Sequence, residues 1–244
     1  MERNIRSIFE FAIGFVWLFL GSVLFIIPMI SIGARVSDLP LMDFLKNIDL
    51  LNSYSTVASC VGHLLGITIF AILFANLIKS DFLSFKKQWI KNIIIIIVGF
   101  ALLYGASILL NYIYSLFGFK EDDTSANQEM IIKILHSSGR VYMIIYSLIL
   151  APILEEIVFR KLLYKALKEN TKLPVWAIVL IISIVFAFIH VSDFESLVYF
   201  PQYFVLAIII TGSYAISKEN LFVSTGLHFL NNLSSVLEIL LTHL

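Results

Sequence analysis

The amino-acid sequence predicts an all-α protein that crosses a membrane several times. Hydrophobic residues make up 59% of the 244 residues and the mean hydropathy is +0.94, whereas soluble domains contain about 45–50% apolar residues. Several apolar runs approach the roughly 20 residues that a helix needs to cross a bilayer. The first run is long and others follow it, so we interpret it as a membrane span and not as a cleaved signal peptide. We therefore expect a polytopic helical bundle of about seven transmembrane helices.

The expected spans are separated by two polar segments and by short turns. The segments 31–56 and 119–140 carry several charged residues and are expected to be loops, the second ending in a short interfacial helix over "MIIKIL". The fourth span is longer than the hydrocarbon core requires, so we expect it to tilt or protrude. We divide the chain into an N-terminal part with three spans, 1–140, and a C-terminal part, 141–244. The spans are expected at 8–30, 57–78, 93–118, 141–170, 174–190, 200–217 and 221–241.

Charge and cysteine content limit the classes of partner and of site. The formal net charge is zero, so no basic field indicates a nucleic-acid partner. An N-terminus in the cytoplasm places twelve Lys and Arg residues on the cytoplasmic side and five outside, which the positive-inside rule favours. The single cysteine, Cys60, excludes an internal disulfide and a cysteine-rich metal site. Lysine-biased, isoleucine-rich usage favours a bacterial plasma membrane as the location.

The second span contains a small-xxx-small pattern, "GHLLG", in which Gly62 and Gly66 lie four residues apart. Such a pattern allows two membrane helices to approach closely. His63 lies between the glycines, and we expect it to be a hydrogen-bonding histidine of the core.

Three charged residues interrupt the fourth span in "LAPILEEIVFRKLL". An ionisable residue at the centre of a bilayer costs at least about 2.5–3.5 kcal/mol, so it usually has a function. Glu156 and Arg160 are four residues apart in the order that favours an ion pair on a helix. Glu155 points about 100° away and has no such partner, and Pro152 is expected to kink the helix just before it. The alternative is that these charges lie at the cytoplasmic end of the span, where the glutamates are hydrated and Arg160 snorkels towards the headgroups.

Two later spans carry polar residues at a comparable depth. His190 ends the fifth span in "FAFIH", and His228 and Asn232 share a face of the seventh span in "GLHFLNN", whereas Asn231 points elsewhere. Glu155 and His190 lie at similar distances from the turn between their spans, so a hairpin brings them together in the cytoplasmic half of the membrane. The seventh span meets them only if this hairpin projects further into the cytoplasm. The alternative is that these polar residues serve only helix packing and interhelical hydrogen bonding.

Together the three motifs resemble the CPBP family of intramembrane proteases, which includes the CAAX prenyl endopeptidases and bacterial Abi-type homologues. The family pattern is Glu-Glu-x-x-x-Arg, Phe-x-x-x-His and His-x-x-x-Asn/Asp on successive core helices. It is matched at every key position by "EEIVFR" (155–160), "FAFIH" (186–190) and "HFLNN" (228–232). The resemblance covers about 141–235, and it implies a four-helix catalytic core.

The resemblance implies a role for each matched residue. Glu155 would act as general base on a water molecule that His190 helps to hold. His228 and Asn232 would line the site and stabilise the oxyanion. The supporting positions of the pattern are Glu156, Arg160 and Phe186.

The chemistry of the residues agrees with this reading. Peptide hydrolysis needs an activated water and hydrogen-bond donors for the oxyanion. Partial burial makes a glutamate a stronger base, and a neutral His228 and the Asn232 amide can both donate. No G-x-S-x-G or H-E-x-x-H motif is present. We favour a site without a cofactor, although Glu155, His190 and His228 could instead form a catalytic zinc site.

The predicted function is therefore that of an endopeptidase that cuts a membrane-associated peptide or protein near the cytoplasmic face. A prenylated tail, a peptide pheromone or a bacteriocin precursor are the candidate substrates. One alternative is a transporter or proton relay, but seven spans do not divide into the equal halves that inverted repeats require. A second alternative is a non-catalytic bacteriocin-immunity or scaffold protein.

Overall fold

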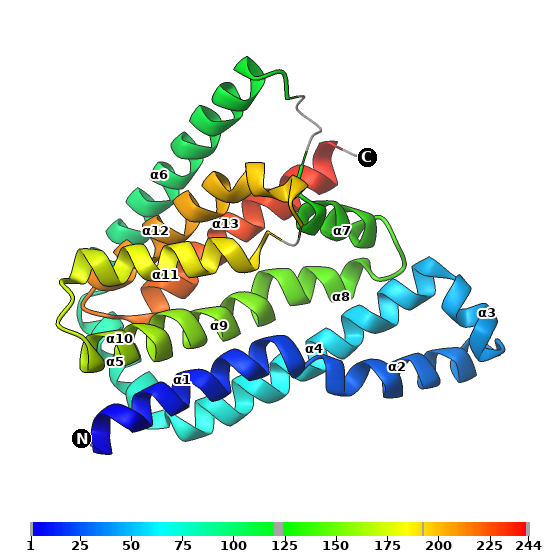
Figure 1. Cartoon of the computed structure of the whole chain (residues 1–244), viewed down its shortest axis with the longest axis horizontal. Coiled ribbons are helices and arrows are strands. Elements are labelled where there is room, and N and C mark those ends of the chain that lie inside the picture. The colour runs from blue at the N-terminus through cyan, green and yellow to red at the C-terminus, as the bar shows by residue number, and fades with distance from the viewer. Residues whose placement is uncertain (1, 120–123, 192, 243–244) are drawn as a thin grey trace.

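The computed structural model describes residues 2–119, 124–191 and 193–242, and these ranges contain helices and no strand (Figure 1). The expected all-α fold is confirmed. In chain order the elements are α1 (Glu2–Leu20), α2 (Val23–Val36), α3 (Leu41–Lys46), α4 (Ile48–Leu73), α5 (Ala75–Lys87), α6 (Trp89–Leu116), α7 (Ala126–Leu135), α8 (Arg140–Ile145), the π-helical turn η1 (Tyr146–Leu150), α9 (Ala151–Glu156), the π-helical segment η2 (Ile157–Leu163), α10 (Tyr164–Asn170), α11 (Val175–Ile189), the 3₁₀ turn η3 (Glu195–Tyr199), α12 (Phe200–Ile216) and α13 (Leu221–Thr242).

The described residues contain five helical segments that are long and apolar enough to cross a membrane. The chain is therefore a multi-pass membrane protein. The other two expected spans are also helices, but α11 has 15 residues and reaches only about 22 Å. α13 has 22 residues and carries several polar side chains. The five segments are Ile5–Val36, Ile48–Leu73, Trp89–Leu116, Arg140–Asn170 and Glu195–Ile216.

The expectation of a loop over 31–56 is wrong, because helices fill most of this segment. The charged residues are exposed on α2, α3 and the start of α4 and, for Asp38, in the turn before α3, while Phe44 is fully buried. A new helix starts after Asn47, whose side-chain oxygen accepts a hydrogen bond from the Leu50 N–H (3.2 Å). In the second expected loop, α7 includes the predicted interfacial helix, and residues 120–123 lie outside the described ranges.

The segment from α8 to α10 runs through the middle of the molecule (Figure 1). It packs on α1 and α4 on one side, and on α11 and α13 on the other. Leu154, Val158 and Leu162 point into the main hydrophobic core together with Phe70 and Ile182. The central position of this segment places its charged residues where side chains from both sides can reach them.

The glycines of α4 allow it to contact α1 closely, as the small-xxx-small pattern predicts. The Trp17 indole N–H donates to the Gly62 carbonyl (3.0 Å). A Cβ atom on Gly62 would lie 2.6 Å from the Gly21 carbonyl oxygen, and one on Gly66 would overlap the Trp17 indole. The contact therefore requires glycine at both positions.

Candidate active site

The helix that carries the two glutamates is irregular just before them. The Ala151 N–H donates to the Tyr146 carbonyl, five residues back, which is the π-helical pattern. The next residue, Pro152, has no N–H to give to the Ser147 carbonyl. Asn232 of α13 supplies that hydrogen bond instead, through its side-chain Nδ2 (2.8 Å). Pro152 therefore frees a backbone acceptor that ties α13 to this helix.

Glu156 and Arg160 form the predicted ion pair inside the protein. Their Oε1 and Nη1 atoms are 2.8 Å apart without hydrogen-bond geometry, and both side chains are 0% exposed. The guanidinium of Arg160 also lies over the ring of Phe186, 4.7 Å from its centre. Burial excludes the alternative in which Arg160 snorkels into water. The two opposite charges instead offset each other where neither is solvated.

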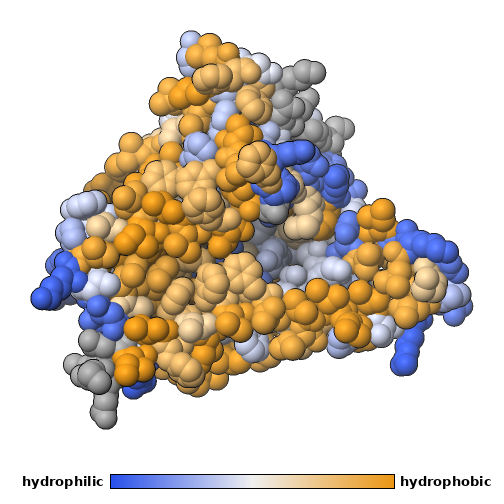
Figure 2. All heavy atoms as spheres, in the orientation of Figure 1, coloured by the Kyte–Doolittle hydropathy of each residue, from blue (hydrophilic) through white to orange (hydrophobic). Residues whose placement is uncertain are grey.

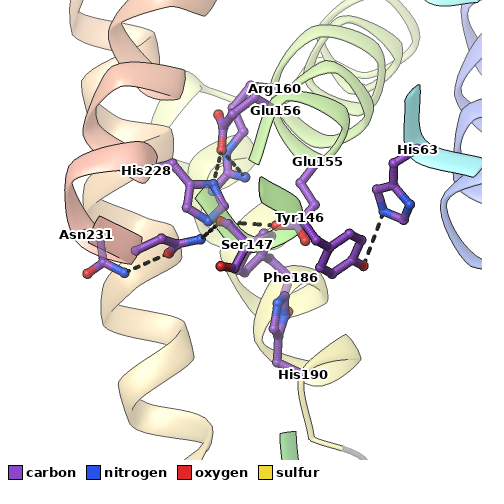
Figure 3. A network of polar contacts seen from close by, with 11 residues as sticks. His63, Tyr146, Ser147, Glu155, Glu156, Arg160, Phe186, His190, His228 and Asn231 are labelled. Atoms are coloured by element: carbon purple, nitrogen blue, oxygen red, sulfur yellow. Dashed lines mark hydrogen bonds and ion pairs between the residues drawn. The ribbon is translucent and has the colours of Figure 1, made fainter. Parts of the chain in front are cut away.

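His228 lies between the two glutamates (Figure 3). Its Nδ1 is 2.9 Å from Glu156 Oε1, and its Nε2 is 3.8 Å from Glu155 Oε2. The Glu156 carboxylate, paired with Arg160, can only accept a hydrogen bond, so Nδ1 carries a proton. A neutral ring then has no proton on Nε2. In this tautomer a donor at Nε2 requires the imidazolium form of His228.

Glu155 is placed differently from its neighbour. Its side chain is 16% exposed, and within the described ranges no Lys or Arg forms an ion pair with it. This agrees with the expectation of one paired and one available glutamate. In Figure 3 the Glu155 carboxylate points away from Arg160, towards Tyr146 and the side on which His190 lies.

His190 follows the last residue of α11 and is held by aromatic rings. Its ring stacks between Phe186 (4.5 Å between centres) and Tyr203 (4.9 Å), and its Nδ1 donates to the Phe186 carbonyl (2.8 Å). That contact leaves Nε2 as a hydrogen-bond acceptor in the neutral ring. His190 also interacts electrostatically with Glu155. Phe186 thus contacts Arg160 and both histidines, since its ring also meets His228 edge-on at 6.1 Å.

Asn232 lies one turn beyond His228 on α13, and part of its hydrogen-bonding capacity is used structurally. Besides its bond to Ser147, its Oδ1 accepts from Asn231 (3.2 Å). One N–H of the Asn232 amide remains for a ligand. Asn231, which the sequence placed elsewhere, therefore helps to orient it.

The three candidate zinc ligands do not form a metal-binding group in the part of the chain that the structure describes. No cluster of three His, Cys, Asp or Glu side chains there is arranged to hold an ion. The Nδ1 atoms of both histidines face protein oxygens. A shared metal would need the Nε2 atoms of His190 and His228 to converge on Glu155.

Tyr146 is a residue near Glu155 that sequence reasoning missed. Its hydroxyl lies 3.4 Å from His63 Nε2, and the two rings meet edge-on at 4.8 Å. His63 Nδ1 lies 3.0 Å from the Ser59 carbonyl, which fixes its proton there and makes Nε2 the acceptor for Tyr146. The prediction that His63 is a hydrogen-bonding core residue is confirmed. A tyrosine in an apolar span is ambiguous in sequence, because its partner is 83 residues away.

The apolar face of the molecule is hollowed near this group of residues. Figure 2 shows a depression with paler, less hydrophobic atoms in an otherwise apolar surface. In the orientation of Figure 1 it lies beside α8 and the end of α11. A substrate chain could approach Glu155 from that side.

Comparison with protein families gives a match that covers this site. Residues 137–234 match the family described as "Rce1-like: Type II CAAX prenyl endopeptidase Rce1-like". No curated protein and no solved structure matches the chain. The matched range contains all three motifs and agrees with the resemblance to the CPBP family. Residues 137–234 are therefore similar to the Rce1-like domain of type II CAAX prenyl endopeptidases, which is consistent with an intramembrane protease of the CPBP family.

Proposed function

We propose that this protease hydrolyses a peptide bond of a membrane-associated peptide or protein with a water molecule that Glu155 activates. The observation that carries the proposal is the contrast between adjacent glutamates. Glu156 is neutralised by Arg160, whereas the one ion-pair contact of Glu155 with a described residue is to the Nε2 atom of His228, 3.8 Å away. A carboxylate at membrane depth without a permanent cationic partner is suited to accept a proton.

Charge balance supports a resting site in which Glu155 and His228 share one proton. If His228 is an imidazolium, the charges of Glu155, Glu156, Arg160 and His228 sum to zero. A buried group of charges is favoured when it is neutral as a whole. Moving that proton to Glu155 also leaves the sum at zero, so the site can pass a proton without creating net charge.

The proposed reaction starts from the state in which Glu155 is ionised and His228 is the imidazolium. Glu155 takes a proton from a water that also donates to Nε2 of His190, while the water oxygen bonds to the carbonyl carbon of the peptide. The carbonyl electrons move to its oxygen, and the Nε2–H of His228 and the remaining Asn232 N–H stabilise this oxyanion. The C–N bond then breaks as Glu155 returns its proton to the leaving nitrogen. One water is consumed, and the products are a carboxyl group and an amine.

Tyr146 acts in this scheme as a positioning residue. Its hydroxyl donates to His63, so its oxygen is free to accept a hydrogen bond from the protonated Glu155 of the intermediate. His63 comes from α4, and it fixes the direction of the Tyr146 hydroxyl through the contacts of both its ring nitrogens.

The hollow of Figure 2 opens through an apolar face, which suits a substrate that reaches the site from the membrane. We propose a lipid-anchored or membrane-embedded peptide, with a prenylated tail, a pheromone precursor and a bacteriocin precursor as the candidates. We further propose a bacterial plasma membrane with the N-terminus in the cytoplasm, because basic residues are concentrated at the end of the bundle that holds α5 and α10.

Zinc hydrolysis at Glu155, His190 and His228 is the second mechanism to test. The three side chains belong to neighbouring helices and comprise the right donor types. Treatment with a chelator, followed by elemental analysis, separates the two mechanisms. Activity that persists without bound metal supports the glutamate mechanism, and activity that returns only with zinc overturns it.

The proposed function is tested by Glu155→Gln in the full chain, purified in detergent and assayed on prenylated and unmodified fluorogenic peptides. We expect turnover to fall roughly 10²–10⁴-fold while thermal stability is unchanged, because the amide keeps its shape but cannot take a proton. The matched control is Glu129→Gln, whose side chain is 54% exposed on α7. Equal cleavage by wild type and Glu155→Gln would end the base assignment and favour a non-catalytic role.

A further inference from the structure

The helix α5 carries a group of lysines without counter-charges. Together with the first turn of α6 it presents four exposed ammonium groups, and none forms an ion pair with a described residue. Three other lysines at this end of the bundle are paired: Lys161 with Asp81 (2.6 Å), Lys165 with Glu10 (2.9 Å) and Lys168 with Glu219. The unpaired lysines, which we call the α5 lysines, are Lys79, Lys86, Lys87 and Lys91.

Large apolar side chains are exposed among the α5 lysines. Leu77, Phe82 and Leu83 are 40–54% exposed on α5, and Trp89 and Ile90 are 59% and 57% exposed at the start of α6. A water-facing helix would not leave these side chains uncovered next to one another. Basic residues mixed with tryptophan, phenylalanine and leucine are typical of a helix that lies in the membrane interface.

The other side of α5 is fastened to the helix that carries His228. Asp81 accepts a hydrogen bond from the Leu221 N–H, the first residue of α13 (3.2 Å), and its carbonyl accepts from Asn220 (2.8 Å). Phe82 also packs edge-on against Phe222 (5.7 Å). The α5 lysines and the start of α13 therefore lie on opposite sides of α5. The start of α13 is two turns before His228.

We propose that the α5 lysines bind the headgroups of anionic phospholipids while the apolar residues enter the bilayer interface. Charge complementarity selects this partner, since lysines near an anionic membrane surface each add to the attraction. A second copy of the chain would bring the same positive surface to α5 and be repelled. Because Asp81 joins α5 to α13, lipid bound on the outer side stabilises the start of the helix that carries His228 and Asn232.

The test compares the full chain in nanodiscs of phosphatidylcholine alone with nanodiscs that also contain phosphatidylglycerol. Native mass spectrometry counts retained phosphatidylglycerol, and thermal unfolding reports stability. We expect phosphatidylglycerol to be retained and to raise the melting temperature, more so at low salt. Substituting the four α5 lysines with glutamine should remove most of both effects, with affinity falling about fivefold per lysine.

The matched control replaces the same four lysines with arginine, which keeps the charge and should keep both effects. All four side chains are exposed, so neither variant removes a core contact. Equal retention of phosphatidylglycerol by the glutamine variant and the wild type would overturn the proposal. Equal stabilisation by the two lipid mixtures would also overturn it. The same holds if the α5 lysines bind an acidic peptide in preference to lipid. These readouts do not involve peptide cleavage, so they stand apart from the proposed mechanism.

Discussion

Glu155 and Glu156 are adjacent in the chain and yet have opposite surroundings. The rotation of about 100° per helical residue turns Glu156 towards Arg160 and His228 and leaves Glu155 facing the opening near Tyr146. A pair of carboxylates in different environments can divide the work, one held ionised for structure and one free to exchange a proton. Substitutions of Glu156 and of Glu155 should therefore have different effects, the first on structure and the second on proton exchange, although the motif contains both residues side by side.

The first prediction concerns Glu156→Gln, which keeps the size of the side chain and an acceptor for His228 but removes the charge opposite Arg160. An unpaired guanidinium that is 0% exposed should cost about 3–5 kcal/mol of unfolding free energy. Thermal unfolding in detergent measures the loss. The double variant Glu156→Gln/Arg160→Met should regain most of the stability without regaining activity, and a wild-type melting temperature for the single variant would contradict the pairing.

The second prediction concerns Tyr146→Phe, which keeps the ring against His63 and removes the hydroxyl. We expect kcat to fall roughly tenfold with KM unchanged, because the lost hydrogen bond is made only to the protonated Glu155 of the intermediate. His63→Gln should cause a similar loss, and the double variant should be no worse than either, because the two side chains act in series. Tyr142→Phe, 44% exposed and one turn away, is the control. Additive losses would show that Tyr146 does not act through His63.

At the scale of helices, the site depends on irregular segments as much as on regular ones. The π-helical turn η1 and Pro152 together expose the Ser147 carbonyl that holds Asn232. The short helix α11 ends at Ile189, just before His190, instead of crossing the whole bilayer, so backbone and side chains at its end can line a polar site. The turn at Pro152 and the end of α11 each begin with a signal in the local sequence and are completed by a contact with a helix distant in the chain.

The sequence predicted those parts of the site that are local in the chain. The i, i+4 relation between Glu156 and Arg160 and the shared face of His228 and Asn232 follow from helix periodicity alone. The contact of His228 Nδ1 with Glu156 joins residues 72 apart. It depends on how α9 and α13 cross, and the π-helical turn shifts the register of that crossing. The tautomer of His228, and hence its chemistry, could therefore be deduced only from the three-dimensional structure.

Helix boundaries were predicted less well where polar residues lie inside helices. The residues 31–56 contain enough charges to resemble a loop, but a cap at Asn47 and the buried Phe44 allow helices there. The spacing of Gly62 and Gly66, in contrast, predicted a close helix contact correctly, because the absence of a Cβ atom has the same effect in any surrounding structure.

The third prediction tests that contact with Gly62→Ala. A Cβ atom there meets the backbone of Gly21, which cannot rotate away, so we expect a loss of about 1–3 kcal/mol in unfolding free energy. Gly105→Ala on α6 is the matched control, since a Cβ atom there has no neighbour within 4 Å. The control should be neutral or stabilising by up to about 1 kcal/mol. Equal melting temperatures for the two variants would show that α1 and α4 are not in tight contact.

At the scale of the whole molecule, the site is not contained in the matched range 137–234. His63 reaches Tyr146 from α4, and Asp81 connects α5 to Lys161 and to the start of α13. The N-terminal helices thus support the catalytic helices directly, although their sequence predicted only generic membrane spans. Substitutions in these N-terminal helices are therefore expected to change activity without touching any of the three motifs.

The last prediction concerns how the whole bundle sits in the membrane. If the N-terminus is cytoplasmic, the end that carries α5 faces the cytoplasm and α7 lies on the outside. In a Cys60→Ser background, the variant Glu129→Cys places a thiol on α7 and Lys86→Cys places one on α5, both at exposed positions. A maleimide that cannot cross membranes should label only the first in intact cells and both after lysis. The reverse pattern would invert the topology, and it would place the α5 lysines at the outer leaflet.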